Sequence, residues 1–193
     1  MPGRIILVRH GETEANRAGC FADSDEIPLT ETGRRQAEEI ARRLGAFNAH
    51  RIFSSPFARA RETSEIIAEA LRLEVEILEG IHERDFGCLK GHPYSRMGEL
   101  MESDPAYDAA RNWTWRPEGG ESLEDVRTRA AAVLEEIRRR HADQVVLIVC
   151  HGAVIQCVSA HLTGDWSRAV VPGNCEILVI ERDSGRAGER YSR

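Results

Sequence analysis

Apolar residues along the chain fall into two alternating patterns, which predict a sheet flanked by helices. Short apolar, β-branched runs are typical of buried strands. They alternate with longer stretches whose apolar residues recur at helical spacing. The predicted strands are Arg4–Val8, Arg51–Ser54, Glu74–Leu78, Val145–Val149 and Glu176–Glu181. The predicted helices are Glu31–Leu44, Ala58–Leu71, a long helix from Ser122 to about His141, and Ala153–Leu162.

Local signals mark several ends of these elements. Thr30 stands where a helix N-cap is expected, and Gly45 is expected to stop the same helix. Ser122 and Asp125 have the spacing of a capping box at the start of the long helix. Pro56 ends the strand before it, because proline cannot donate to a sheet ladder.

Strands that alternate with helices predict βαβ units, a mostly parallel sheet and helices on both of its faces. Residues 84–120 interrupt this alternation with glycine, proline and aromatic positions, and they predict a loop-rich excursion with one or two short helices. A chain of 193 residues is most economically one domain, so we expect residues 1–193 to form a single domain that carries this excursion.

Composition narrows the class of protein. The chain is 41% hydrophobic and 30% charged, with a formal net charge of −6, as in ordinary soluble domains. An acidic chain binds nucleic acid and anionic membranes poorly, so we expect neither as a partner. No apolar run approaches the length of a membrane span or of a signal-peptide core. We therefore expect a cytoplasmic protein, and the sequence leaves a homodimer open.

The cysteines indicate free thiols rather than disulfides or a metal site. There are five of them, an odd number, and none has Cys-x-x-Cys spacing: Cys20, Cys88, Cys150, Cys157 and Cys175. Cys150 adjoins His151, but neighbouring residues on a strand point to opposite faces and are awkward joint ligands. Free thiols fit a reducing compartment.

Two predicted strands lead into a His-Gly pair, and this repeat is the main functional signal. The first strand runs into Arg9, His10 and Gly11, and the fourth runs through Cys150 into His151 and a further glycine. In a parallel sheet both strand ends lie at the same edge, where ligands bind in open α/β folds. Arginine grips phosphate oxygens and a neutral imidazole can attack phosphorus, so the pair favours phosphate chemistry over two unrelated exposed histidines.

Two more strand ends supply candidate charges at the same edge. After the second strand, Arg59 and Arg61 both stand on the first turn of a helix, where they point in different directions. After the third strand come several acids, and spacing alone does not choose among Glu79, Glu83 and Asp85.

Six ordered motifs together resemble the histidine phosphatase superfamily, which contains cofactor-dependent phosphoglycerate mutases, fructose-2,6-bisphosphatase domains, α-ribazole phosphatases and broad-specificity phosphatases. The motifs are LVRHGETEAN at 7–16, PLTETG at 28–33, SSPFARARET at 54–63, HERDFGCLKG at 82–91, PEGGES at 117–122 and VCHGAVIQ at 149–156. They cover nearly the whole chain. The resemblance implies a three-layer α/β/α sandwich with a mostly parallel central sheet, the phosphoglycerate mutase-like fold.

The resemblance also implies roles for individual residues. His10 matches the nucleophile that becomes phosphorylated, Arg9 and Arg59 match the phosphate-binding arginines, His151 matches the second pocket histidine, and Glu83 matches the general acid. Further positions of the pocket, for substrate and phosphate, are Gly11, Thr13, Asn16, Phe21 and Gly152. No metal or other cofactor is implied.

We therefore expect a metal-independent phosphomonoester hydrolase that acts on a small phosphorylated metabolite through a phosphohistidine. A phosphoglycerate mutase-type phosphotransferase is the alternative, and a non-catalytic phosphate-ligand binder is the third hypothesis. Asp23 stands where relatives often carry Gln-Gly and opposes a second phosphate, which favours hydrolysis, whereas Leu89 is the mutase-like choice. A short basic flap of Arg186, Arg190 and Arg193 would also suit a mutase. Selectivity for the alcohol is expected from residues 84–120.

Overall fold

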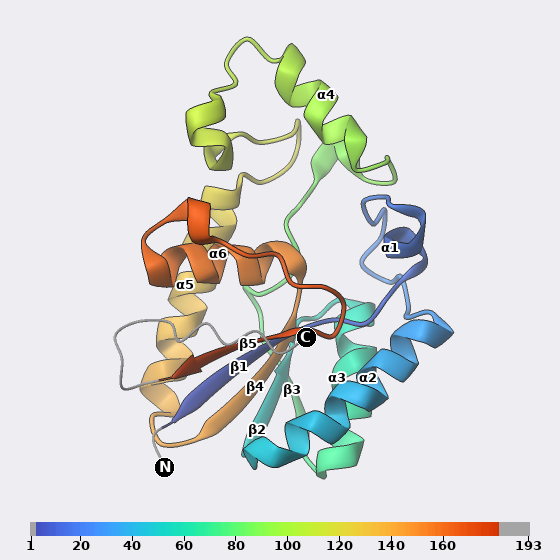
Figure 1. Ribbon diagram of the computed structural model, residues 1–193, viewed down its shortest axis with the longest axis vertical. Coiled ribbons are helices and arrows are strands. Elements are labelled where there is room, and N and C mark those ends of the chain that lie inside the picture. The colour runs from blue at the N-terminus through green and yellow to red at the C-terminus, as the bar shows by residue number, and fades with distance from the viewer. Residues whose placement is uncertain (1–2, 182–193) are drawn as a thin grey trace.

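The computed structural model describes residues 3–181, which form a five-stranded sheet between two layers of helices (Figure 1). The strands are β1 (Arg4–Arg9), β2 (Arg51–Ser54), β3 (Val75–Ile77), β4 (Val145–Cys150) and β5 (Ile177–Glu181). The α-helices are α1 (Glu14–Ala18), α2 (Glu31–Leu44), α3 (Ala58–Leu71), α4 (Ser95–Ser103), α5 (Leu123–Arg140) and α6 (Gly152–Thr163). Short 3₁₀ turns lie at Gly45–Phe47, Gly87–Leu89, Ala109–Thr114 and Trp166–Arg168. Every predicted strand and helix is present, and α1 was not predicted.

The sheet has the strand order β3-β2-β4-β1-β5. All pairs are parallel except β1 with the edge strand β5, so the prediction of a mostly parallel sheet is confirmed. In the β1–β4 pair Val8 lies opposite Val149 and Arg9 lies opposite Cys150. This register brings the residues that follow the two strands, His10 and His151, next to each other at the edge of the sheet.

Alternate residues of the central strands face opposite helical layers. Ile5 and Leu7 of β1 belong to the cluster under α5 and α6, whereas Ile6 and Val8 belong to the cluster under α2 and α3. Figure 1 shows these two helix pairs on opposite faces of the sheet. Each fully buried Ile, Leu or Val contributes about 1.5–3 kcal/mol relative to exposure, so both faces hold the sheet in place. The predicted three-layer sandwich is confirmed.

The helix ends follow the sequence signals with one difference. The Thr30 side chain accepts from the Gly33 N–H at 3.0 Å, and Ser122 and Asp125 form the expected reciprocal capping box. α2 ends at Leu44 with Gly45 as its C-cap, as predicted, but Gly45 does not adopt the left-handed conformation typical of a glycine at this position. Its φ is −53°, and the chain continues into the 3₁₀ turn Gly45–Phe47.

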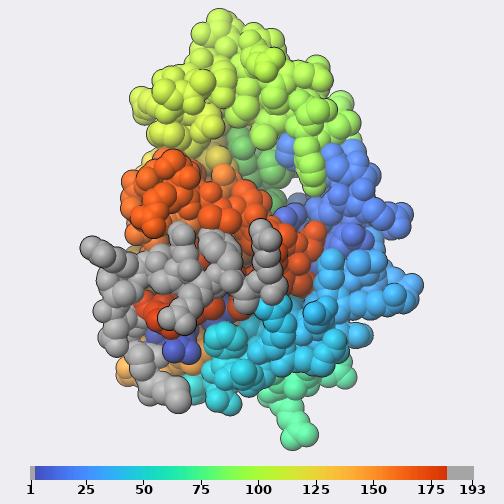
Figure 2. All heavy atoms as spheres, in the orientation of Figure 1, coloured from blue at the N-terminus to red at the C-terminus, as the bar shows by residue number. Residues whose placement is uncertain are grey.

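Residues 84–120, here called the cap, stand over the carboxyl edge of the sheet (Figure 1). The cap has its own apolar cluster, in which Phe21 packs with Leu89 and Trp115. Trp113 of the cap stacks on Trp166 after α6, with ring centroids 5.6 Å apart. Figure 2 shows the surface hollowed where the green cap meets the blue N-terminal segment. The predicted excursion therefore covers the carboxyl ends of the strands.

Candidate active site

His10 and His151 lie side by side beneath the cap, as the strand register requires. Their ring centroids are 5.2 Å apart and the rings are tilted by 59°. His10 is 3% exposed, and His151 is fully buried as the N-cap of α6. The predicted meeting of the two His-Gly pairs is therefore confirmed as geometry.

Local hydrogen bonds fix the protonation of His10. Its Nδ1 lies 2.7 Å from the Gly11 carbonyl oxygen, which can only accept, so Nδ1 carries the proton and Nε2 keeps its lone pair. Burial lowers the pKa of His10 well below its usual value, and the nearby charges of Arg59 and Arg9 lower it further. The imidazole is therefore neutral near pH 7 and its Nε2 can act as a nucleophile.

His151 is held from its other nitrogen. Its Nε2 lies 2.7 Å from the Ser55 hydroxyl, which also accepts from the Phe57 N–H, so the hydroxyl hydrogen is free to point at Nε2. The proton of His151 then sits on Nδ1, a buried atom without a partner among residues 3–181. Burial lowers the pKa of His151 well below its usual value, with Arg59 and His10 acting in the same direction.

The two arginines that the sequence suggested both border the histidines. Arg9 donates from Nη1 to the Pro172 carbonyl at 2.7 Å, and its buried Nε has no partner within the described part of the chain. Arg59 is 3% exposed; its guanidinium lies over the Phe57 ring, 5.1 Å from the centroid, and its one hydrogen bond among residues 3–181 is long, 3.5 Å to the Ser24 carbonyl. Burial lowers the pKa of Arg59, which the Glu83 carboxylate opposes. Both guanidinium groups retain donors for an anion.

Arg61, the competing arginine, points away from the histidines. It donates to the Pro56 carbonyl at 2.7 Å and pairs with Glu26 at the surface. The geometry therefore chooses Arg59, as the resemblance implied.

Among the three candidate acids, only Glu83 lines the same pocket as His10. Glu79 is exposed and does not line it. Asp85 is engaged with Lys90 at 2.9 Å and with the Gly87 N–H at 2.9 Å. Glu83 is thus the acid positioned for proton transfer.

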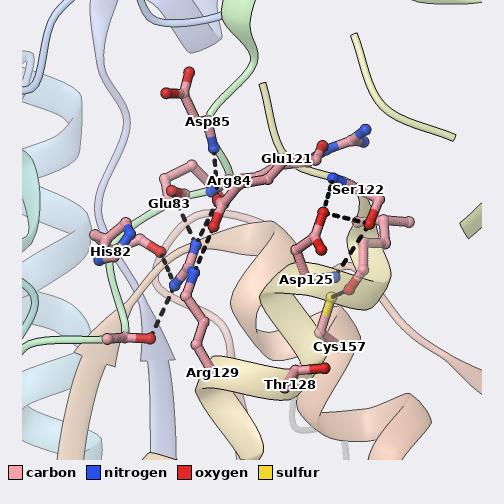
Figure 3. A network of polar contacts seen from close by, with 12 residues as sticks. His82, Glu83, Arg84, Asp85, Glu121, Ser122, Asp125, Thr128, Arg129 and Cys157 are labelled. Atoms are coloured by element: carbon pink, nitrogen blue, oxygen red, sulfur yellow. Dashed lines mark hydrogen bonds and ion pairs between the residues drawn. The ribbon is translucent and has the colours of Figure 1, made fainter. Parts of the chain in front are cut away.

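Arg129 of α5 holds the segment that carries Glu83 (Figure 3). Its Nη1 donates to the carbonyl oxygens of Gly80 and His82, both at 2.8 Å, and its Nη2 donates to the Glu83 carbonyl at 3.2 Å. Both Nε and Nη2 also donate to the Glu121 carboxylate at 2.9 Å. One planar guanidinium therefore fixes the backbone on both sides of His82.

The remaining expected pocket residues divide into lining residues and one supporting residue. Those that line the cavity are Thr13, Asn16, Phe21 and Gly152. Gly11 does not line it, because its N–H donates to Thr63 Oγ1 at 3.0 Å. A Cβ on Gly11 would lie 2.5 Å from the Gly33 carbonyl oxygen, so this glycine permits close backbone packing. Its contribution to the site is the carbonyl that orients His10.

Three functional neighbours were not found from the sequence: Ser55, Arg129 and Asn174. Asn174 donates to the His10 carbonyl at 3.0 Å and to Asn16 Oδ1 at 3.1 Å, so it ties the loop before β5 to the first motif. Ser55 lies inside a recognised motif, but its hydrogen-bond partner, His151, is 96 positions away in the sequence. No local signal indicates such long-range contacts.

The cavity has two connected lobes that share Arg59 and Glu83. The cap lobe, of about 500 Å³, contains Arg9 and His10 and extends beneath Met97 of α4. The acidic lobe, of about 330 Å³, is bordered by carboxylates: Asp25, Glu83, Asp85 and Glu121. Asp23 itself lines neither lobe, but its neighbours Ala22 and Ser24 line the acidic one, where Asp25 contributes a carboxylate.

Two further searches cover residues 3–181 only. No three His, Cys, Asp or Glu side chains in that range are grouped so that they could hold a metal ion. Within the same range no helix combines the length and the apolar character needed to cross a membrane.

Comparisons with known proteins agree with this geometry. The model of the histidine phosphatase superfamily (branch 1) matches residues 5–190. Phosphoserine phosphatase 1 of Hydrogenobacter thermophilus is 36% identical over 166 residues, covering 83% of this chain and 76% of that protein. The metal-independent phosphoserine phosphatase of Arabidopsis thaliana is 35% identical over 162 residues, covering 82% and 68%. A structure of mycobacterial glucosyl-3-phosphoglycerate phosphatase with VO3 has a TM-score of 0.82 and 27% identity, covering 98% and 96%.

Proposed function

The chain belongs to the histidine phosphatase superfamily and has its phosphoglycerate mutase-like fold, and we propose that it hydrolyses monoesters of small phosphorylated metabolites through a phosphohistidine on His10. One observation carries this proposal. A neutral histidine, whose Nε2 has no hydrogen-bond partner among residues 3–181, lines one cavity with two arginines and Glu83, and a second histidine is buried beside it.

The proposed reaction has two steps at phosphorus. His10 Nε2 attacks, the bond from phosphorus to the ester oxygen breaks, and Glu83 protonates the departing alkoxide. Glu83 then takes a proton from water, whose oxygen attacks phosphorus and breaks the bond to His10. Inorganic phosphate leaves and both side chains return to their starting states.

Positive groups stabilise the charge that develops on the equatorial phosphate oxygens. The guanidinium groups of Arg9 and Arg59 and the unpaired Nδ1 of His151 are donors fixed before substrate arrives, which is the arrangement that electrostatic catalysis requires. The main-chain supports of His10 and Glu83 add positioning, the other large contribution in phosphoryl transfer.

Hydrolysis is favoured over mutase chemistry by the charge at the cavity. Asp25 borders the acidic lobe and would repel a second phosphate there, whereas Asp85 and Lys90 of the same lobe balance each other's charge. Leu89, the mutase-like residue, is fully buried in the cap cluster, so its identity serves packing. The proposed basic flap of Arg186, Arg190 and Arg193 lies outside the described residues.

Supplying 3-phosphoglycerate with catalytic 2,3-bisphosphoglycerate tests hydrolysis against the mutase alternative. We expect phosphate release from a suitable monoester to be faster than formation of 2-phosphoglycerate, followed by coupled assay and by free-phosphate assay. Isomerisation far faster than phosphate release from every ester would contradict the proposal. Binding of phosphate with no turnover at all would instead support a non-catalytic binder.

Removal of divalent ions tests the arginine-based account. We expect activity to survive excess EDTA within about twofold, because the two guanidinium groups supply the charge stabilisation that a metal would otherwise provide. Vanadate is expected to inhibit by taking a five-coordinate form in the phosphate site. Activity that EDTA abolishes and magnesium or zinc restores would overturn this account.

Arg129→Lys tests whether the clamp on Glu83 serves proton transfer. Lysine keeps one charge but loses the planar fork, so kcat/KM for an alkyl phosphate is expected to fall about tenfold or more. The same measurement with p-nitrophenyl phosphate, whose leaving group needs little protonation, is expected to change less than about threefold.

Arg127→Lys is the matched control, because Arg127 stands on the same helix and, within residues 3–181, pairs only with Glu124. Equal losses on both substrates, or a loss of thermal stability without a change in their ratio, would mean that Arg129 acts only in folding.

The cysteines support the cytoplasmic location that we also propose. All five are free thiols, and burial raises the pKa of Cys157 and Cys175 to about 12. Free thiols, of which the buried ones are held in the unreactive protonated form, fit a reducing compartment.

A further inference from the structure

The wall of the cap lobe beyond the phosphate residues is apolar. Seven large apolar or aromatic side chains line it: Phe21, Phe86, Tyr94, Met97, Met101, Leu123 and Val171. A volume of about 500 Å³ lies within the range of small-molecule pockets and exceeds what a phosphate group needs. The leaving alcohol therefore occupies a largely apolar space, and two methionines let that wall adapt to its shape.

The cap lobe offers no free cation to a charged alcohol. Apart from the two arginines at the phosphate end, Arg84 is the one Lys or Arg among the described residues that line it. Arg84 is buried and donates from Nε to the Glu121 carbonyl at 2.7 Å and from Nη2 to the Trp115 carbonyl at 3.2 Å. Its Nη1 contacts the Met97 sulfur at 4.0 Å. The donors of Arg84 therefore serve to hold the cap together and are not available to a substrate.

The acidic lobe would also reject a carboxylate. Its border contains Asp25, which makes no ion pair among residues 3–181, and two carboxylates whose charges are already paired, Asp85 with Lys90 and Glu121 with Arg129, both at 2.9 Å. Its other cations are Arg59, at the phosphate end, and Arg84, which holds the cap, so this lobe has no free cation for a carboxylate either. A carboxylate on the alcohol would thus lose hydration in one lobe or meet like charge in the other.

Neutral polar groups remain available in the cap lobe. Asn112 and Gln156 line it, and their side-chain amides carry donors and acceptors without a charge. They can bond to a hydroxyl or amide on the alcohol without requiring a charge.

We propose that this enzyme selects monoesters of uncharged, largely apolar alcohols of about aromatic size over esters whose alcohol carries a carboxylate. The inference rests on the proposed phosphatase function and names its substrate class. It separates this chain from the phosphoserine specificity that the names of two relatives state for those proteins.

Four esters of primary alcohols test the selectivity, because all of them leave as alkoxides that need protonation by Glu83. They are 2-phenylethyl phosphate, ethyl phosphate, O-phosphoserine and 3-phosphoglycerate. We expect kcat/KM for 2-phenylethyl phosphate to exceed each of the others at least about tenfold, since apolar groups in such pockets discriminate by this order.

Substitutions in α4 locate the selectivity. Met97→Ala is expected to reduce the preference for 2-phenylethyl over ethyl phosphate about tenfold and to leave ethyl phosphate within about threefold. Met101→Lys places a cation in the wall and is expected to raise kcat/KM for 3-phosphoglycerate while lowering that for 2-phenylethyl phosphate. Ser95→Lys adds the same charge at an exposed position of the same helix outside the lobe and is expected to change neither. Thermal melting verifies that all three variants fold.

The outcomes distinguish the inference from the proposed function. If phosphoserine or 3-phosphoglycerate matches or exceeds 2-phenylethyl phosphate, the inferred substrate class is wrong while the phosphatase function stands. If the preference exists but Met97→Ala and Met101→Lys leave it unchanged, the cap lobe does not produce it and the inference is overturned. If none of the four esters is hydrolysed, the proposed function fails, and the inference fails with it.

Discussion

Replacing His10 with alanine is expected to lower kcat for every phosphate ester by about 10⁴-fold or more, because the substitution removes the atom that forms the covalent intermediate. The neutral His10 imidazole is held by the Gly11 carbonyl with Nε2 free, and no other described residue offers an equivalent nucleophile in the cap lobe. Steady-state rates with an alkyl phosphate and with p-nitrophenyl phosphate measure the loss.

Two further histidine variants make this result specific. His151→Ala keeps the nucleophile and loses a charge-stabilising donor, so a smaller loss of about 10²–10³-fold is expected. His161→Ala changes a histidine of α6 that lies outside both lobes and is expected to remain fully active. Residual activity in His10→Ala above that of His151→Ala would mean that the roles are reversed.

Glu83→Gln is expected to lower kcat/KM for an alkyl phosphate by about 10²–10⁴-fold and that for p-nitrophenyl phosphate by less than about tenfold. The difference arises because kcat/KM reports the first chemical step, in which only the alkoxide needs a proton. Slow hydrolysis of the phosphoenzyme should then appear as a burst of p-nitrophenol, since Glu83 also activates the water.

Glu79→Gln is the matched control for this variant. Glu79 lies on the same segment, is exposed and lines neither lobe, so its amide should behave as the native enzyme does. Equal losses on both substrates in Glu83→Gln, without a burst, would show that Glu83 is not the general acid.

Much of the site was predictable because it follows the sheet. β1 and β4 are readable from the apolar runs that reach Val8 and Val149, and the pairing of these strands brings His10 and His151 together. Helix spacing did not decide whether Arg59 or Arg61 belongs to the site, and spacing after the third strand did not decide among the acids there. The motifs resolved these choices, and the direction of each side chain agrees with them.

The rest depends on contacts between distant parts of the chain. Arg129 reaches the Gly80 carbonyl 49 positions away, and Asn174 reaches the His10 carbonyl 164 positions away. Asp25 rather than Asp23 lines the acidic lobe, and residue spacing in the irregular loop before α2 does not indicate which of the two side chains does so. Periodicity carries no information about such contacts.

Trapping the intermediate tests the central claim most directly. Native enzyme, His10→Ala and His161→Ala are mixed with ³²P-labelled substrate, quenched in alkali and digested, and the labelled peptide is identified. The account predicts label on His10 in the native enzyme and in His161→Ala, labile in acid and stable in alkali as a phosphoramidate is, and no label in His10→Ala. Label that persists in His10→Ala, or that survives acid, would contradict it.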